Sequence, residues 1–98
     1  MPQATRTQQA EDDLVDILHA VARRSVKAAE RLRDDIDATI TRLVSFPRLG
    51  RPCAKLAPGL FRYAVSGHLI FYYITDEGIE VVRVLDGARN ITSDMFDD

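Results

Sequence analysis

The chain has 98 residues, 46% hydrophobic and 29% charged, with a formal net charge of −2. These values fit a single domain over residues 1–98 and argue against a non-specific nucleic-acid binder, which usually carries an excess of Lys and Arg. No apolar run approaches the ~20 residues of a membrane-spanning helix, so we expect a cytoplasmic protein. One cysteine, Cys53, cannot form an internal disulfide, and the two separated histidines lack metal-ligand spacing. We therefore predict no metal site and no cofactor.

The first half of the chain predicts a short strand and two helices. Residues 2–6 can form an edge strand, Thr7 suits the N-cap of a helix over 8–23, and Ser25 suits the N-cap of a second helix that ends at Phe46-Pro47. Helical spacing places Leu14, Ile17, Leu18 and Val21 on one face of the first helix. The second helix has a matching face of Ala29, Leu32, Ile36, Ile40 and Leu43. We expect an antiparallel helical hairpin.

The second half predicts an antiparallel sheet. Glycines and prolines mark a loop after Pro47, and three β-rich runs follow at about 60–65, 68–75 and 79–85. Turns at Ser66-Gly67 and at residues 76–78 connect these runs as a meander. The order βααβββ defines an α+β fold, with an antiparallel sheet packed against the two-helix hairpin.

Both faces of this sheet are predicted to be apolar. The run 68–75 places Leu69, Phe71 and Tyr73 on one side and Ile70, Tyr72 and Ile74 on the other. A single helical hairpin covers only one face of a sheet. Either the sheet curls around a core of its own, or the second face meets another chain.

Four ordered sequence blocks follow the predicted hairpin. They are PRLGRP (47–52), PGLFR (58–62), GHLIFYY (67–73) and VRVLDGAR (82–89). This series resembles the N-P-R-x-G-R, P-G-x-R, G-x-x-x-I-x-Y and R-V-L-H-G-x-R blocks of the RelE/ParE superfamily. Residues 10–17 are similar to its A-E-x-D-L-x-x-I opening helix. The resemblance is to ParE-like toxins, the toxin half of type II toxin–antitoxin systems, which have a βααβββ fold.

The resemblance also implies partners. ParE-like toxins are neutralised by a ParD-like antitoxin, whose helical and then extended segment covers the helical hairpin and the sheet. Operator DNA is contacted through the antitoxin. ParE-like members inhibit DNA gyrase and stall it on cleaved DNA, whereas RelE-like members cut messenger RNA on the ribosome.

The sequence favours the gyrase inhibitor over the ribonuclease. RNA cleavage needs groups that activate the 2′-OH, stabilise charge on the phosphate and protonate the leaving oxygen. At the positions that RelE-like nucleases use, this chain has Leu69, Arg89 and Met95, of which only the arginine suits that chemistry. We predict no catalytic residue. The alternatives are a ribosome-dependent mRNA endonuclease of the RelE type and a degenerate, non-toxic antitoxin-binding member, consistent with Asp86 where ParE-like relatives commonly have histidine.

Arginines and aromatic residues are the candidate contacts. Arginine anchors interfaces and binds phosphate in bidentate geometry, so the predicted target-binding residues are Arg62, Arg83 and Arg89, followed by Arg48 and Arg51. Apart from Arg89, each has an alternative role within the fold: Arg83 in a buried ion pair, Arg62 in support of the sheet edge, and Arg48 and Arg51 in ordering the loop after the second helix. Tyr63, Tyr72 and Phe96 have no evident core role and are the predicted antitoxin contacts.

Overall fold

The structure is a computed structural model that describes residues 2–87 and 89–97. Its elements are β1 (Gln3–Arg6), α1 (Gln8–Ala22), α2 (Val26–Ser45), a 3₁₀ turn η1 (Pro47–Leu49), β2 (Arg51–Pro52), β3 (Leu60–Val65), β4 (His68–Thr75), β5 (Gly78–Asp86) and a second 3₁₀ turn η2 (Ser93–Phe96). No helix in the described ranges combines the length and apolarity needed to cross a bilayer.

The strands form one five-stranded sheet in the order β1-β5-β4-β3-β2. The predicted meander of β3, β4 and β5 is confirmed, whereas β1 runs parallel to β5, so the sheet is mixed rather than wholly antiparallel. Gly78 permits this pairing, because a Cβ at that position would collide with the backbone of Gln3. The predicted α+β fold is confirmed.

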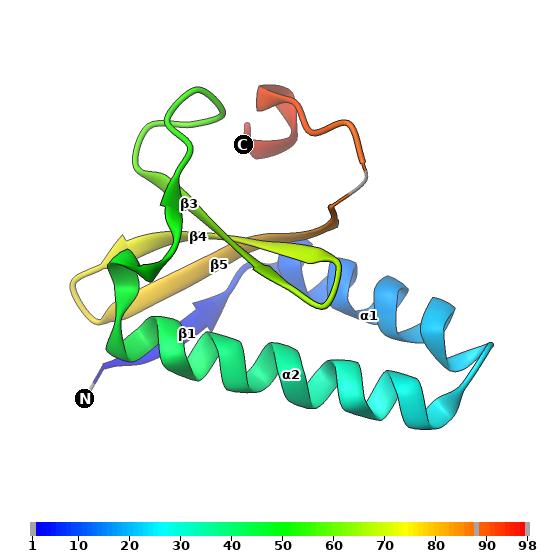
Figure 1. The fold of residues 1–98 in the computed structure, drawn as a ribbon. Helices are drawn as coiled ribbons and strands as arrows, with labels where there is room; N and C mark the ends of the chain where they lie inside the picture. The colour runs from blue at the N-terminus through cyan, green and yellow to red at the C-terminus, as the bar shows by residue number, and fades with distance from the viewer. Residues whose placement is uncertain (1, 88, 98) are drawn as a thin grey trace.

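Both helices cover the same face of the sheet (Figure 1). Their N-caps are as predicted: the Thr7 hydroxyl accepts the Ala10 N–H at 3.1 Å, and the Ser25 hydroxyl accepts the Ala28 N–H at 3.1 Å. The predicted helical faces form the main core with the inward side of the sheet. Its buried residues are Ala10, Leu14, Leu32, Ile36, Ile40, Leu43, Ile70, Tyr72, Ile79, Val81 and Val84.

The second face of the sheet is covered by the chain itself. Leu60, Phe71 and Leu85 form a separate buried cluster there. The loop at 53–57 and the C-terminal residues 91–96 supply its cover, and Figure 1 shows both segments on the side away from the helices. The predicted alternation along β4 is confirmed, since Leu69, Phe71 and Tyr73 belong to this second cluster. Of the two alternatives for the apolar face, a core within the chain is the one observed.

Candidate functional site

A row of residues crosses the sheet on the face away from the helices. Arg51 on β2 is opposite Arg62 on β3, which is opposite Phe71 on β4, which in turn is opposite Arg83 on β5. Residues directly opposite in antiparallel strands project to the same face. Because Phe71 belongs to the second cluster, three predicted target-binding arginines share that face.

A β-bulge on β5 sets the place of Arg83. Tyr72 pairs with Val81 and Phe71 pairs with Arg83, so Val82 is one extra residue between them. A bulge of this kind re-aims the side chains beside it. It brings Arg83 into the row with Phe71.

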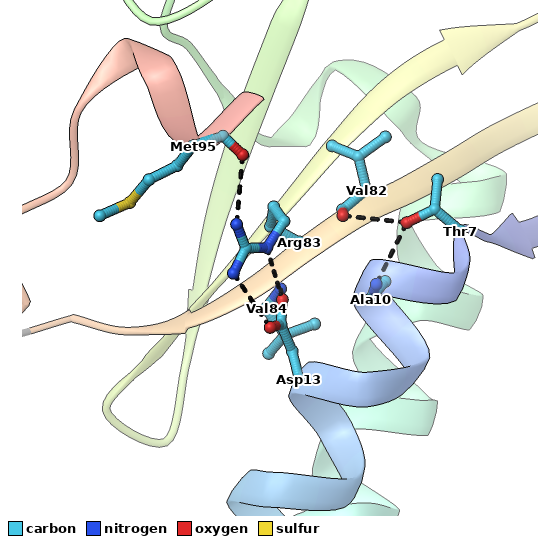
Figure 2. A network of polar contacts seen from close by, with 7 residues as sticks. All are labelled: Thr7, Ala10, Asp13, Val82, Arg83, Val84 and Met95. Atoms are coloured by element: carbon cyan, nitrogen blue, oxygen red, sulfur yellow. Dashed lines mark hydrogen bonds and ion pairs between the residues drawn. The ribbon is translucent and has the colours of Figure 1, made fainter. Parts of the chain in front are cut away.

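Arg83 is fully engaged within the chain (Figure 2). Its Nε donates to Asp13 Oδ2 at 2.8 Å, its Nη2 donates to Asp13 Oδ1 at 3.1 Å, and its Nη1 donates to the Met95 carbonyl oxygen at 3.2 Å. The Arg83 and Asp13 side chains are only 13% and 12% exposed. All three guanidinium nitrogens donate within the chain, so we withdraw Arg83 from the target-binding set. Its alternative role in an ion pair is the one observed, and the pair is partly rather than fully buried.

The same carboxylate completes the free edge of β5. Pairing with β1 ends at Val81, and beyond it Asp13 Oδ2 accepts the backbone N–H of Val84 at 3.0 Å. The Thr7 hydroxyl also donates to the Val82 carbonyl oxygen at 3.0 Å (Figure 2). The start of α1 is thereby fastened to β5 at two points. This network therefore stabilises the packing of α1 on the sheet.

The other cations of this region have no such partner. Arg48, Arg51, Lys55 and Arg62 are called here the basic edge. Among the described residues, ion pairs are formed by Arg6 and Arg83 and by none of these four. Arg48, Arg51 and Lys55 are exposed and Arg62 is half-buried. Since β2 is the last strand of the sheet, the basic edge faces outward.

Cys53 lies next to the basic edge. Burial raises the pKa of the Cys53 thiol, and the nearby Arg62 guanidinium opposes that rise. The thiolate is the nucleophilic form of cysteine, and it is disfavoured here. Cys53 packs against the second cluster, as a small apolar side chain does.

Tyr72 has a different role from the predicted antitoxin contact. Its side chain is 0% exposed, because β4 places it in the main core. Its hydroxyl donates to the Pro47 carbonyl oxygen at 2.7 Å and accepts the Gly50 N–H at 3.0 Å. The prediction that Tyr72 lacks a core role and meets a partner is therefore wrong. Tyr72 instead fixes the turn that carries Arg48 and leads into Arg51.

Gly50 is required at that turn. A Cβ at Gly50 would collide with the Tyr72 hydroxyl and lie 2.8 Å from the Arg62 carbonyl oxygen. Burial raises the pKa of Tyr72, while the hydrogen bond from Gly50 opposes the rise. The hydroxyl thus stays neutral and can donate to Pro47.

The remaining predicted contacts are dispersed. Phe96 is half-buried and packs on Phe71 with ring centroids 4.8 Å apart, so the premise that it has no core role is wrong. Tyr63 is half-buried against the main core. Arg89 is exposed beyond β5, next to the β3–β4 turn, where the Gly87 N–H donates to Gly67 O at 3.0 Å. Arg89 thus lies outside the basic edge.

The histidines do not adjoin the arginine row. His68 Nδ1 is 3.1 Å from the Ser66 carbonyl oxygen at the β3–β4 turn. It is three residues from Phe71, or about 10 Å along the strand. His19 is exposed on α1, a helix packed on the opposite face of the sheet. The residues described in the structure contain no group of His, Cys, Asp or Glu side chains that could hold a metal ion.

A cavity of 790 Å³ lies where β5 meets the C-terminal segment. Its charged lining consists of Arg83 with the acids Glu80, Asp94 and Asp97. Because Arg83 is already paired with Asp13, the unneutralised charge there is negative. Such a cavity repels the phosphates of RNA.

Residues 5–91 match the family described as the ParE toxin of type II toxin-antitoxin system, parDE. The chain is 31% identical to Toxin ParE3 of Caulobacter vibrioides over 96 residues, which are 97% of this chain and 96% of that protein. It is 39% identical to Toxin ParE1 of Mycobacterium tuberculosis over 74 residues, which are 74% and 76% of the two chains.

The fold agrees with these matches. A chain of the solved structure described as the chromosomal ParDE TA system from P. aeruginosa superposes with a TM-score of 0.72 at 22% identity, covering 88% of this chain and 96% of that one. The resemblance to the RelE/ParE superfamily is confirmed. Within that class, the chain belongs to the ParE toxin family of type II toxin–antitoxin systems.

Proposed function

We propose that this protein is a non-catalytic inhibitor of DNA gyrase that a ParD-like antitoxin holds inactive. Membership of the ParE toxin family supports the proposal. The observation that carries it is the contrast between the basic edge and Arg83 on the face of the sheet away from the helices. The basic edge offers cations that form no ion pair within the described residues, whereas Arg83 is paired with Asp13 and no histidine adjoins the row. This arrangement suits stoichiometric binding better than acid–base catalysis.

The helical segment of the antitoxin would bind on the helical side of the molecule. A groove of 370 Å³ between α1 and α2 is lined by Leu14, Val15, Leu18 and Ile36 together with the charged Arg6, Glu11, Arg33 and Asp37, and Val15 is 50% exposed. An amphipathic helix buries its apolar face in a groove of this kind. Tyr63 and Phe96 remain predicted contacts for an extended segment, and Tyr72 does not. Operator DNA would be bound by the antitoxin, and both proteins would act in the cytoplasm.

Two substitutions on the helices test this docking mode. Val15→Asp places a charge in the groove, so its Kd for the ParD-like antitoxin should rise by roughly tenfold or more. Val26→Asp is the matched control, because Val26 is 64% exposed at the start of α2 and does not line the groove. Equal antitoxin affinity for both variants would place the antitoxin elsewhere.

The proposed activity is tested by supercoiling of relaxed plasmid with purified gyrase. Added toxin should abolish supercoiling and trap linear DNA after denaturation, and added antitoxin should restore supercoiling. A ribosome-dependent messenger RNA cleavage assay is run in parallel. Cut messenger with normal supercoiling would establish the RelE-type ribonuclease instead, and silence in both assays would indicate an inactive member or a different target.

A further inference from the structure

Two arginines of the basic edge face each other without an anion between them. Arg51 and Arg62 are directly opposite on β2 and β3, and like charges at such positions destabilise a strand pair. Neither has a carboxylate partner among residues 2–87 and 89–97, although Arg6 and Arg83 both form ion pairs. Neither guanidinium therefore adds an ion pair to the described fold. An anion from outside the chain would relieve the repulsion.

The pair is held in place before any partner arrives. The β2–β3 pairing fixes the two backbones, and the Tyr72 hydroxyl fixes the turn before β2 through Pro47 and Gly50. Pre-organised donors lose less conformational entropy on binding. An arginine fork matches both phosphate and carboxylate groups, so the surroundings must distinguish these two anions.

The surroundings of the pair favour phosphate. The large, exposed hydrophobic residues of the described chain are Val15, Val26, Phe46 and Leu49, and none lies on β2, on β3 or in the loop 53–59. Protein interfaces have an apolar centre, whereas surfaces that contact DNA are polar and positively charged. The pair has Lys55 and Arg48 nearby, and β2, β3 and the loop 53–59 offer no large exposed apolar residue as an anchor for protein.

An apolar surface suited to protein lies immediately beside the basic edge. Phe46, Pro47, Leu49 and Ile74 line a groove of 530 Å³, and Phe46 is 64% exposed. Arg48 belongs to the rim of that groove as well as to the basic edge. The two surfaces therefore meet at η1, so a partner made of protein and DNA could contact both.

We propose that the basic edge binds phosphate groups of the duplex DNA held by gyrase, so that the toxin contacts the enzyme and its DNA together. This inference rests on the proposed function. Acidic residues elsewhere give the chain its net charge of −2, so free DNA is bound weakly. The phosphate contact forms when gyrase holds the toxin and the DNA in one complex.

The test compares the Kd of the toxin for gyrase alone and for gyrase loaded with a linear duplex. The wild-type chain should bind the DNA-loaded enzyme at least about tenfold more tightly, since even one charge-assisted hydrogen bond has this effect. The preference should shrink as salt is raised. The variant Arg51→Gln/Arg62→Gln should lose the preference and keep the wild-type Kd for gyrase alone.

The control variant is Arg23→Gln/Arg24→Gln, which removes the same charge from exposed positions after α1. It should retain the preference for DNA-loaded gyrase. If wild-type affinity is the same with and without DNA, and Arg51→Gln/Arg62→Gln weakens both, the arginines contact protein carboxylates and the inference is overturned while the proposed function survives. If the toxin binds neither free nor DNA-loaded gyrase, the inference and the proposed function are both overturned.

Discussion

Arg62 and Arg83 occupy the same row of one sheet face, yet their surroundings give them opposite roles. The Arg83 side chain is only 13% exposed, and each of its three guanidinium nitrogens donates to Asp13 or to the Met95 carbonyl oxygen. Arg62 lies two strands away beside the exposed Arg51, with no carboxylate to neutralise either one. The comparison shows that an arginine in a family motif can be part of the fold or available to a partner. What decides between the two is whether another element supplies an acid.

Breaking the Asp13–Arg83 pair should have the largest effect on stability. Asp13→Asn leaves a guanidinium that is only 13% exposed without its counter-charge, and it weakens the acceptor for the Val84 N–H. We expect a loss of about 3 kcal/mol in the free energy of unfolding, measured by urea denaturation. Asp37→Asn is the control, because its ion pair with Arg6 is exposed and contributes at most about 1 kcal/mol. Equal losses in the two variants would contradict the structural role of Asp13.

Removing Phe96 should test the C-terminal cover. Phe96→Ala removes the ring that packs on Phe71, and we expect a loss of about 2 kcal/mol in the free energy of unfolding, less than for a fully buried ring. Phe46→Ala is the matched control, since an exposed ring should change stability by no more than about 0.5 kcal/mol. A Phe96→Ala variant as stable as the wild type would mean that residues 91–96 do not stabilise the second cluster.

Removing the Tyr72 hydroxyl should have a smaller effect. Tyr72→Phe keeps the packing but leaves the Gly50 N–H and the Pro47 carbonyl oxygen without their partner, which should cost about 1 kcal/mol. Hydrogen exchange at the Gly50 amide should be faster. Tyr63→Phe, at a half-buried position whose hydroxyl has no hydrogen bond within the described residues, should leave that amide unchanged.

The same hydroxyl predicts a dependence on alkaline pH. Burial raises the pKa of Tyr72 in the folded state, so its contribution to stability is complete below the unfolded pKa and is lost as pH rises through the folded pKa. Denaturation at a series of pH values above about 9 should show a smaller alkaline loss in Tyr72→Phe than in the wild type. Identical pH profiles would indicate that Tyr72 is not the group responsible.

Replacing the basic pair should leave stability almost unchanged. Arg51→Gln/Arg62→Gln removes a like-charge repulsion and no ion pair, so the free energy of unfolding should change by no more than about 0.5 kcal/mol. Thermal denaturation of the purified variant checks this. A large loss would show that these arginines support the sheet, which was the competing role expected for such residues.

Local patterns in the sequence predict most of this fold. Helical spacing and the caps Thr7 and Ser25 place the two helices to within one residue, and β propensity with turn residues places β3 and β4. The strand β2 is missed because it has only two residues, one of them Pro52, and forms only by pairing with β3. The parallel pairing of β1 is missed because it joins distant segments.

The site is less accessible to sequence reasoning. Asp13 and Arg83 are 70 residues apart, and no local pattern links them. The burial of Tyr72 cannot be predicted from the sequence, because both sides of β4 are apolar. The alternation of residues along β4 therefore does not identify the side that faces the helices. A usable signal is the neighbouring P-R-L-G turn, where Gly50 permits the close approach of a hydroxyl. The local cluster of cations between 48 and 62, by contrast, is visible in the sequence.

The most direct test is the concentration of toxin that halves gyrase supercoiling, measured for the wild type, for Arg51→Gln/Arg62→Gln and for the charge-matched Arg23→Gln/Arg24→Gln. The proposed roles predict that the first variant folds normally and needs at least about tenfold more protein, while the second inhibits like the wild type. Full inhibition by Arg51→Gln/Arg62→Gln would contradict the role given to the basic edge.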